Sequence, residues 1–142
     1  VSKALLAEYV AAKKRNKPFK ELGLEHMNKS CLVIRAQLTS SNLRSTQFQN
    51  DIFCLRDRDL LNCFAAEVSK YQAQGKSKES AFVVSYQVAE DLGKAFSDRA
   101  ILQISIKAEN NVINASLKNI LGLLRLMYVL VTLEEDVVFL RY

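Results

Sequence analysis

The sequence has few residues that force a turn. It contains one Pro, four Gly and no Trp in 142 residues. Because Pro and Gly mark most turns, their scarcity excludes a fold of many short strands and favours long helices. Hydrophobic residues make up 49% and charged residues 25% of the chain, which is typical of a soluble globular protein. A chain of this length is expected to form one domain.

The sequence also lacks a disulfide framework and a long hydrophobic run. Cys31, Cys54 and Cys63 are too few for such a framework, which indicates a reducing compartment. The most apolar run, residues 120–133, is shorter than the about 20 residues of a membrane span and contains Arg125. Neither end carries a recognisable targeting signal. We therefore expect a soluble intracellular chain with no membrane span, in which residues 120–133 are buried on most sides.

The net charge of +5 comes from one short segment. Its five cations are Lys13, Lys14, Arg15, Lys17 and Lys20, and the rest of the chain carries equal numbers of basic and acidic residues. Cations suit the C-terminal end of a helix, so we interpret the segment as a helix end and a solvated linker. Only Phe19 lies among these charges, which leaves no aromatic surface for stacking bases. We expect no nucleic-acid binding; the alternative, binding through residues 13–20, would depend steeply on salt.

Apolar periodicity predicts four main helices. The first covers residues 1–16, and the second starts among the capping residues 39–42 and ends at Gly75. The third starts at Ser77 or Ser80, and a turn at 110–114 precedes the last helix at 116–133. Expected core positions are Phe53, Leu60, Phe64, Val68 and Tyr71 in the second helix and Phe82, Tyr86, Ala89, Phe96 and Ala100 in the third. The prediction is an all-α helical bundle with a single domain over residues 1–142.

Reactive residues are scarce and widely separated. His26 and Cys31 could form a nucleophile and base, but a solvated loop histidine is the simpler interpretation. No Cys-x-x-Cys pair exists for zinc, and Cys54 and Cys63 are interpreted as small core fillers on opposite helix faces. The glycines at 23, 75, 93 and 122 have the spacing of neither a dinucleotide loop nor a phosphate loop. Gly93 is expected to permit close approach of another helix.

Two charged clusters are interpreted as structural. Residues 56–59 alternate Arg and Asp between apolar residues, which indicates ion pairs on a solvated face or at a subunit contact. The carboxylates of Glu134, Glu135 and Asp136 are given the same interpretation. The residues alone thus predict no catalytic, cofactor-binding or metal-binding side chain. They support a helical interaction or scaffold domain.

Three segments resemble one enzyme family. "FCLRDRDLLNCFAAEV", "SYQVAEDLGKAFSDRAILQ" and "ILGLLRLMYVLVTLEEDVVFLRY" are similar to the C-terminal helical region of flavin-dependent acyl-CoA oxidases, in particular the plant peroxisomal type that prefers medium-chain substrates. "VSKALLAEY" is similar to the helix that follows the catalytic segment. The resemblance implies a peroxisomal parent enzyme that contains flavin adenine dinucleotide (FAD). That enzyme converts acyl-CoA and O2 to trans-2-enoyl-CoA and H2O2 in fatty-acid β-oxidation.

The same resemblance limits what this chain is expected to do. In the family the catalytic Glu and the flavin and acyl pockets precede the segment that matches Val1, so no residue here inherits a catalytic or FAD-binding role. We expect a fragment, incomplete at both ends, that packs against the upstream flavin and acyl-CoA domains and forms part of a homodimer interface. Its lost neighbours should leave apolar surface that self-associates. The alternative is a stand-alone, non-enzymatic helical interaction module.

Overall fold

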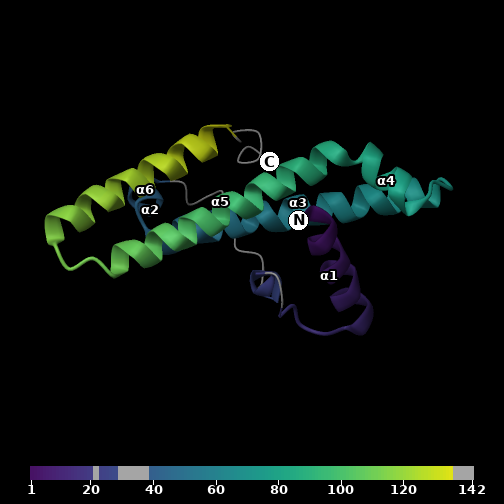
Figure 1. The fold of residues 1–142 in the computed structure, drawn as a ribbon, viewed down its shortest axis with the longest axis horizontal. Helices are drawn as coiled ribbons and strands as arrows, with labels where there is room; N and C mark the ends of the chain where they lie inside the picture. Colours follow the sequence, from purple (N-terminus) through teal and green to yellow (C-terminus); the bar gives the residue numbers. More distant parts are fainter. Residues whose placement is uncertain (21–22, 29–38, 136–142) are drawn as a thin grey trace. The chain divides into compact units, whose positions relative to one another are not determined.

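Figure 1 shows a computed structural model of the chain, in which residues 1–20, 23–28 and 39–135 are described. Every regular element in these ranges is a helix. In chain order they are α1 (Ser2–Arg15), the 3-10 helix η1 (Glu25–Asn28), α2 (Ser40–Leu43), α3 (Thr46–Ala73), α4 (Lys78–Val84), α5 (Tyr86–Asn110) and α6 (Ala115–Glu135). The predicted all-α class is confirmed, and α1, α3, α5 and α6 correspond to the four predicted main helices.

The chain divides into two compact units. Unit 1 comprises Val1–Cys31 and Leu55–Phe96, and therefore contains α1, η1, α4, most of α3 and the first turns of α5. Unit 2 comprises Leu32–Cys54 and Ser97–Tyr142, and contains α2, the first turns of α3, the rest of α5 and α6. That the whole chain acts as one domain stays a prediction.

The core of unit 1 is apolar. Its buried members are Leu5, Leu6, Tyr9, Leu24, Leu61, Phe64, Val68, Ala81 and Leu92, and Leu60, Tyr71, Phe82, Ala89 and Phe96 pack against them. Two hydrogen bonds fix α1 to its neighbours: the Ser2 hydroxyl donates to the Ala89 carbonyl, and the Tyr9 hydroxyl donates to Asn62 Oδ1 at 2.6 Å. The core positions predicted in α3 are therefore confirmed within this unit.

Helix ends follow the capping rules. Asn16 adopts a left-handed conformation (φ 50°) after α1, and Gly75 does the same (φ 87°) after α3. The Ser77 side chain accepts from the Ser80 N–H to cap α4, and Asn114 Oδ1 accepts from the Leu117 N–H at 3.1 Å to cap α6. The predicted caps at Ser77 and Gly75 and the predicted turn at 110–114 are confirmed.

Two helices predicted as continuous are interrupted. Thr39 caps only the short α2, and α3 starts separately at Thr46, because Ser45 supplies a new cap by accepting from the Phe48 N–H. Ser85 likewise separates α4 from α5. This break turns Tyr86 outward, where it is 61% exposed, so its predicted place in the core is wrong.

Burial in α6 also differs from the prediction. The helix was expected to be buried on most sides, yet only 22% of its most apolar window is buried. Arg125, Val129, Thr132 and Leu133 are the buried residues of the helix. They recur at spacings of four and three residues and so form one stripe. Leu121, Leu126 and Tyr128 are half-buried, and the remaining large apolar side chains of α6 are exposed.

Candidate functional site

The predicted nucleophile and base cannot be compared with the structure, because Cys31 lies outside the described residues. His26 lies in η1, and both of its ring nitrogens are buried, so the interpretation as a solvated loop residue is wrong. The His26 carbonyl accepts from the Arg58 guanidinium at 3.5 Å, which connects η1 to α3. Asn28, in the same short helix, donates to the Phe19 carbonyl and accepts from the Phe19 N–H, both at 2.7 Å. These contacts hold the loop that contains η1 against its own unit.

The cysteines and carboxylates provide no metal site in the described ranges, where no group of three or more potential ligands occurs. Cys63 is exposed and Cys54 is half-buried, so the interpretation of Cys63 as a core filler is wrong. The exposed position arises because Cys63 lies between Leu61 and Phe64, which both point into the core. Glu134 and Glu135 are exposed, as expected for structural carboxylates, and Asp136 lies outside the described residues.

The cluster at residues 56–59 is only partly on a solvated face. Arg56 and Asp57 are each 3% exposed, while Arg58 and Asp59 are half-buried. The solvated-face interpretation is therefore wrong for the first two. Around residues 56–59, α3 is covered by other parts of the protein on more than one side, as the burial of Phe53 and Leu61 shows. Arg56 and Asp57 lie within this covered part of the helix. Ionised side chains in such surroundings require partners.

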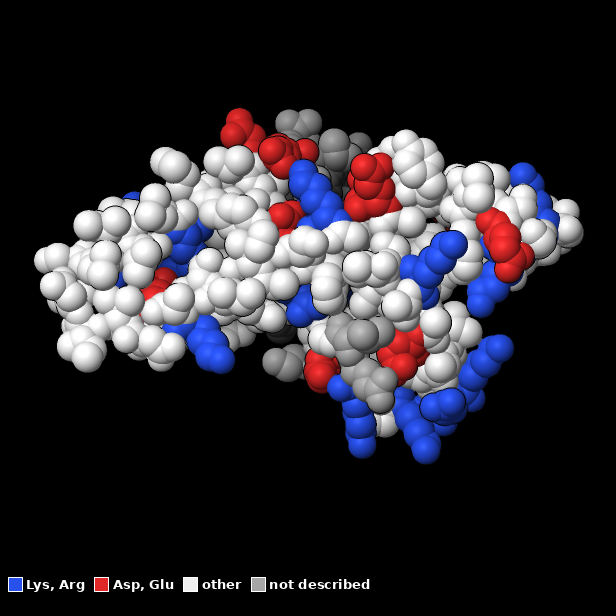
Figure 2. Space-filling model, viewed as in Figure 1, with Lys and Arg blue, Asp and Glu red and all other residues white. Residues whose placement is uncertain are grey.

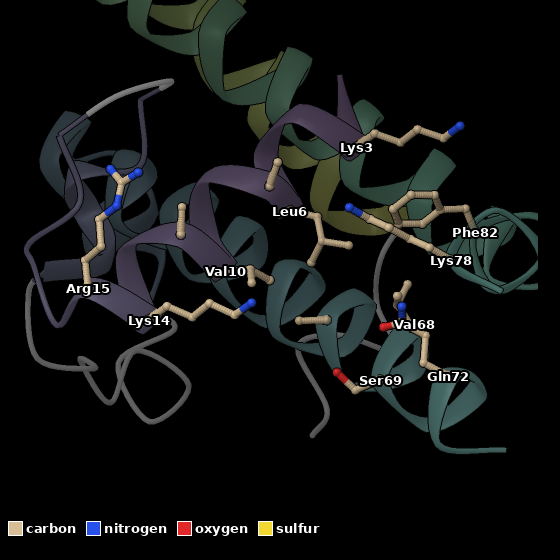
Figure 3. Close-up of a pocket in the computed structure, with 13 residues that line it drawn as sticks. Lys3, Leu6, Val10, Lys14, Arg15, Val68, Ser69, Gln72, Lys78 and Phe82 are labelled. Atoms are coloured by element: carbon tan, nitrogen blue, oxygen red, sulfur yellow. The ribbon is translucent and has the colours of Figure 1, made fainter. Parts of the chain in front are cut away.

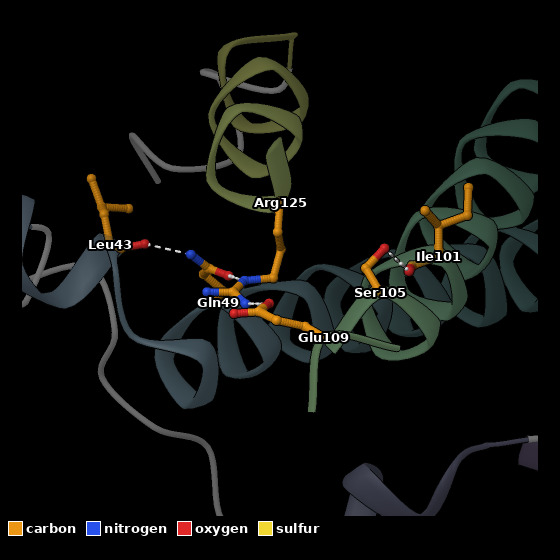
Figure 4. A network of polar contacts seen from close by, with 6 residues as sticks. All are labelled: Leu43, Gln49, Ile101, Ser105, Glu109 and Arg125. Atoms are coloured by element: carbon orange, nitrogen blue, oxygen red, sulfur yellow. Dashed lines mark hydrogen bonds and ion pairs between the residues drawn. The ribbon is translucent and has the colours of Figure 1, made fainter. Parts of the chain in front are cut away.

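A buried polar network lies in unit 2 (Figure 4). Arg125 descends from α6 between α3 and α5; its Nε donates to Gln49 Oε1 at 3.0 Å, and its guanidinium pairs with the Glu109 carboxylate. Gln49 is fully buried and also donates to the Leu43 carbonyl at 2.8 Å. Burial lowers the pKa of Arg125 from its ordinary value. The network joins the C-terminal end of α2 to α3, α5 and α6.

A second polar contact supports α6. The Tyr128 hydroxyl donates to Asp98 Oδ1 at 2.6 Å, which connects α6 to α5 one turn away from Arg125. The Arg125 Nε, both atoms of the Gln49 amide, the Glu109 carboxylate, the Tyr128 hydroxyl and Asp98 Oδ1 are all used in contacts within the protein. The arrangement fits a structural role that fixes the position of α6.

Opposite this network, α6 presents an apolar surface. Its exposed members are Leu117, Ile120, Leu123, Leu124, Met127, Leu130 and Val131, with exposed fractions from 44% to 65%. We call these residues the α6 apolar face. Positions 117, 120, 124, 127 and 131 alternate spacings of three and four residues, the pattern by which one helix packs along another. In Figure 2 the surface over the first turns of α6 is mostly uncharged.

The same composition gives α6 a second possible interpretation. Among the described helices it is long and apolar enough to cross a membrane. The core helix of a soluble protein meets the same criterion, so composition alone is weak support for a span. Arg125 and Thr132 on the buried stripe are polar and face the protein, while most of the helix surface is exposed.

A groove of about 460 Å³ lies among α1, α3 and α4 in unit 1 (Figure 3). Leu6, Val10, Val68 and Phe82 supply apolar side chains, and Lys3, Lys14, Arg15 and Lys78 surround them. We call this feature the cationic groove. No Asp or Glu is among the described residues that line it. Blue side chains also gather over the α1 part of the surface in Figure 2.

Sequence reasoning did not identify either the network or the groove. Arg125 was noticed as a charge within an apolar run, and such a charge signals a buried partner. The partners Gln49 and Glu109 lie 76 and 16 residues away in sequence, and nothing in their own segments marks them. The groove could not be predicted because Lys3 of α1 and Lys78 of α4 both lie beside Phe82 only once the chain is folded.

Comparison with known proteins gives relatives of one kind. The chain is 58% identical over all 142 residues to "Acyl-coenzyme A oxidase 3, peroxisomal" of Arabidopsis thaliana, of which it spans 21%. A second Arabidopsis protein, whose name also assigns it to the peroxisomal acyl-coenzyme A oxidases, is 56% identical over the same 142 residues and is likewise covered over 21%. No protein-family model matches the chain. The resemblance to peroxisomal acyl-CoA oxidases is thus confirmed, and the chain spans about a fifth of the length of these relatives.

Proposed function

We propose that the chain is a helical part of a peroxisomal, flavin-dependent acyl-CoA oxidase and that it serves this enzyme by packing, without catalysing the reaction alone. The identity of 58% over the whole chain is the observation that carries the proposal. The parent reaction is oxidation of an acyl-CoA by O2 to trans-2-enoyl-CoA and H2O2, a step of fatty-acid β-oxidation. The peroxisome is the corresponding location.

No FAD-binding role is assigned to the described residues. A common way to hold the pyrophosphate of a flavin dinucleotide is a glycine-rich loop at a helix start, whose backbone N–H groups converge on it. Here Gly93 and Gly122 lie inside helices, and Gly75 ends one. No step of the oxidation is therefore assigned to a residue of this chain, and FAD belongs to the parent enzyme.

Packing is proposed to use the α6 apolar face. Seven large apolar side chains are exposed on this one helix, and a contiguous exposed apolar patch marks a candidate interaction site. The network of Arg125, Gln49 and Glu109 fixes α6 from the opposite side. The α6 apolar face is therefore held in a defined orientation in which a partner can pack against it. The partners proposed are the flavin and acyl-CoA domains of the same enzyme, together with a second subunit of a homodimer.

A segment exchange tests the proposal. This chain replaces the matching 142 residues of Arabidopsis acyl-coenzyme A oxidase 3, and purified protein is assayed for bound flavin, H2O2 production with acyl-CoA, and mass in solution. We expect a flavin-containing, active dimer from the exchange, and neither flavin nor H2O2 from the chain alone. Stoichiometric flavin and H2O2 from the isolated chain would overturn the proposal.

A matched pair of variants assigns the packing to α6. In the exchanged enzyme, Leu124→Glu with Met127→Glu should separate subunits or domains and abolish activity. Glu substitutions at the exposed positions Lys70 and Lys76 serve as the control, because they add acidic charge away from α6. Equal activity and mass for both pairs would contradict a packing role of the α6 apolar face.

A further inference from the structure

We propose that the cationic groove binds a small phosphorylated amphiphile, a molecule with one apolar chain and a phosphate monoester head. The inference goes beyond the packing role and does not depend on it. It stands on three features of unit 1: two ammonium groups beside one aromatic ring, the absence of carboxylates among the described lining residues, and an apolar floor beside the charges.

The head-group end is defined by Phe82. The Lys3 ammonium lies 5.2 Å from the centroid of this ring and the Lys78 ammonium lies 5.7 Å from it. The aromatic ring stabilises each cation but supplies no negative charge to neutralise it. A phosphate monoester carries between about one and a half and two negative charges at pH 7 and so matches two ammonium groups.

The floor of the groove suits an alkyl chain. Leu6 and Val68 are nearly buried members of the unit 1 core, and Val10 lies one turn of α1 beyond Leu6. In Figure 3 Leu6 and Val10 lie between Phe82 and the end of α1 that carries Lys14. An alkyl chain whose head group lies at Lys3 and that follows α1 would therefore contact apolar side chains first and then the methylene groups of Lys14. The cavity volume of about 460 Å³ is that of a small-molecule site.

The charge of the groove is one-sided. Lys14 and Arg15 add two cations at its far end, and no ion pair joins any of the four rim cations to a carboxylate among the residues that the structure describes. A concave surface lined by one sign of charge concentrates its field and attracts anions. The groove therefore selects a negatively charged amphiphile over a neutral one.

The test is a titration of the full 142-residue chain with dodecyl phosphate below its critical micelle concentration. Calorimetry gives stoichiometry and affinity, and isotope-edited NMR locates the site. We expect saturable binding of one molecule per chain with shifts at Leu6, Val10 and Phe82. Lys3→Ala with Lys78→Ala should weaken binding by about tenfold or more, the loss expected when charge-assisted contacts are removed. Circular dichroism confirms that each variant keeps its helical content.

The matched control is Lys17→Ala with Lys76→Ala, which removes the same charge from the same unit but outside the groove. Its affinity should change by less than about twofold, as expected of screened, distant charges. Val10→Asn should weaken binding without changing net charge. Equal loss in the two Lys pairs would show unspecific charge attraction and overturn the proposal.

Other ligands distinguish this site from alternative sources of binding. Dodecyl maltoside, which has the chain without the charge, and inorganic phosphate, which has the charge without the chain, should both bind much more weakly. Equal affinity for either would overturn the proposal, as would binding to vesicles containing phosphatidic acid without binding to monomeric dodecyl phosphate. Loss of dodecyl phosphate binding in Leu124→Glu with Met127→Glu would also overturn it, since the α6 apolar face would then be the site.

Discussion

The two units distribute polar and apolar groups in opposite ways. Unit 1 buries an apolar core around Leu5, Phe64 and Leu92 and displays most of its cations outside. In unit 2, α6 buries Arg125 and exposes leucines and a methionine. A large exposed apolar patch on such a helix marks a candidate interaction surface. The difference shows that the cations of unit 1 lie mostly on its surface, whereas α6 places a charge inside unit 2 and large apolar side chains on its surface.

The largest effect is expected from a substitution in the buried polar network of unit 2. Arg125→Met should lower the free energy of unfolding by about 3–5 kcal/mol, because Gln49 and Glu109 would lose a buried charged partner. Urea unfolding of the isolated chain, followed by circular dichroism, measures the change. Arg15→Met, on the exposed side of unit 1, is the control and should cost less than about 0.5 kcal/mol. If both variants unfold at the same urea concentration, the network contributes nothing to stability.

The next effect tests the apolar core of unit 1. Leu61→Ala should cost about 2–5 kcal/mol, since the side chain is 1% exposed and its loss leaves a cavity. Leu123→Ala removes the same atoms from the α6 apolar face and should cost less than about 0.5 kcal/mol in the isolated chain. Urea unfolding compares the pair. A similar cost for both would mean that the α6 face is already covered in the isolated chain.

A smaller effect concerns one hydrogen bond of unit 1. Tyr9→Phe removes the hydroxyl that donates to Asn62 and should cost about 0.5–1.5 kcal/mol. Tyr86→Phe removes an equivalent hydroxyl from an exposed position and should leave the thermal midpoint almost unchanged. The contrast would disappear if the Asn62 contact were absent in solution.

The smallest effect has the opposite sign. Gly93→Ala should stabilise the chain by up to about 1 kcal/mol, because Ala is the better helix former. The added Cβ would lie 3.5 Å from Ser2 Oγ, an ordinary van der Waals distance, so it can be accommodated. Gly122→Ala is the matched change in α6, where the Cβ would lie 3.2 Å from Glu109 Oε1 and disturb the partner of Arg125. A lower thermal midpoint for Gly93→Ala would restore the prediction that α1 requires a glycine there.

Local signals predicted the helices well. The scarcity of Pro and Gly, the cap at Ser77 and the asparagines before α6 were sufficient for the all-α class and for most helix ends. The breaks at Ser45 and Ser85 were missed because a serine is compatible with both a helix interior and a cap. Which of these it adopts depends on tertiary packing.

Burial was predicted less well for a physical reason. An apolar helix is buried only if the surface that covers it is present, and periodicity does not reveal where that surface lies. Arg125 was the visible clue that one side of α6 differs from the other, yet its partners come from α3 and α5. The cationic groove likewise depends on side chains from three helices, which no single segment of sequence brings together.

Gln49 places an unusual restriction on sequence variation. Its side-chain amide accepts from Arg125 with one atom and donates to the Leu43 carbonyl with the other. Glutamate can only accept when ionised, lysine can only donate, and asparagine is one methylene shorter. In a saturation mutagenesis library selected for folded protein, position 49 should therefore tolerate fewer substitutions than the exposed leucines of α6. During evolution, a buried amide that must both donate and accept a hydrogen bond should therefore accept fewer substitutions than an apolar surface whose side chains can replace one another.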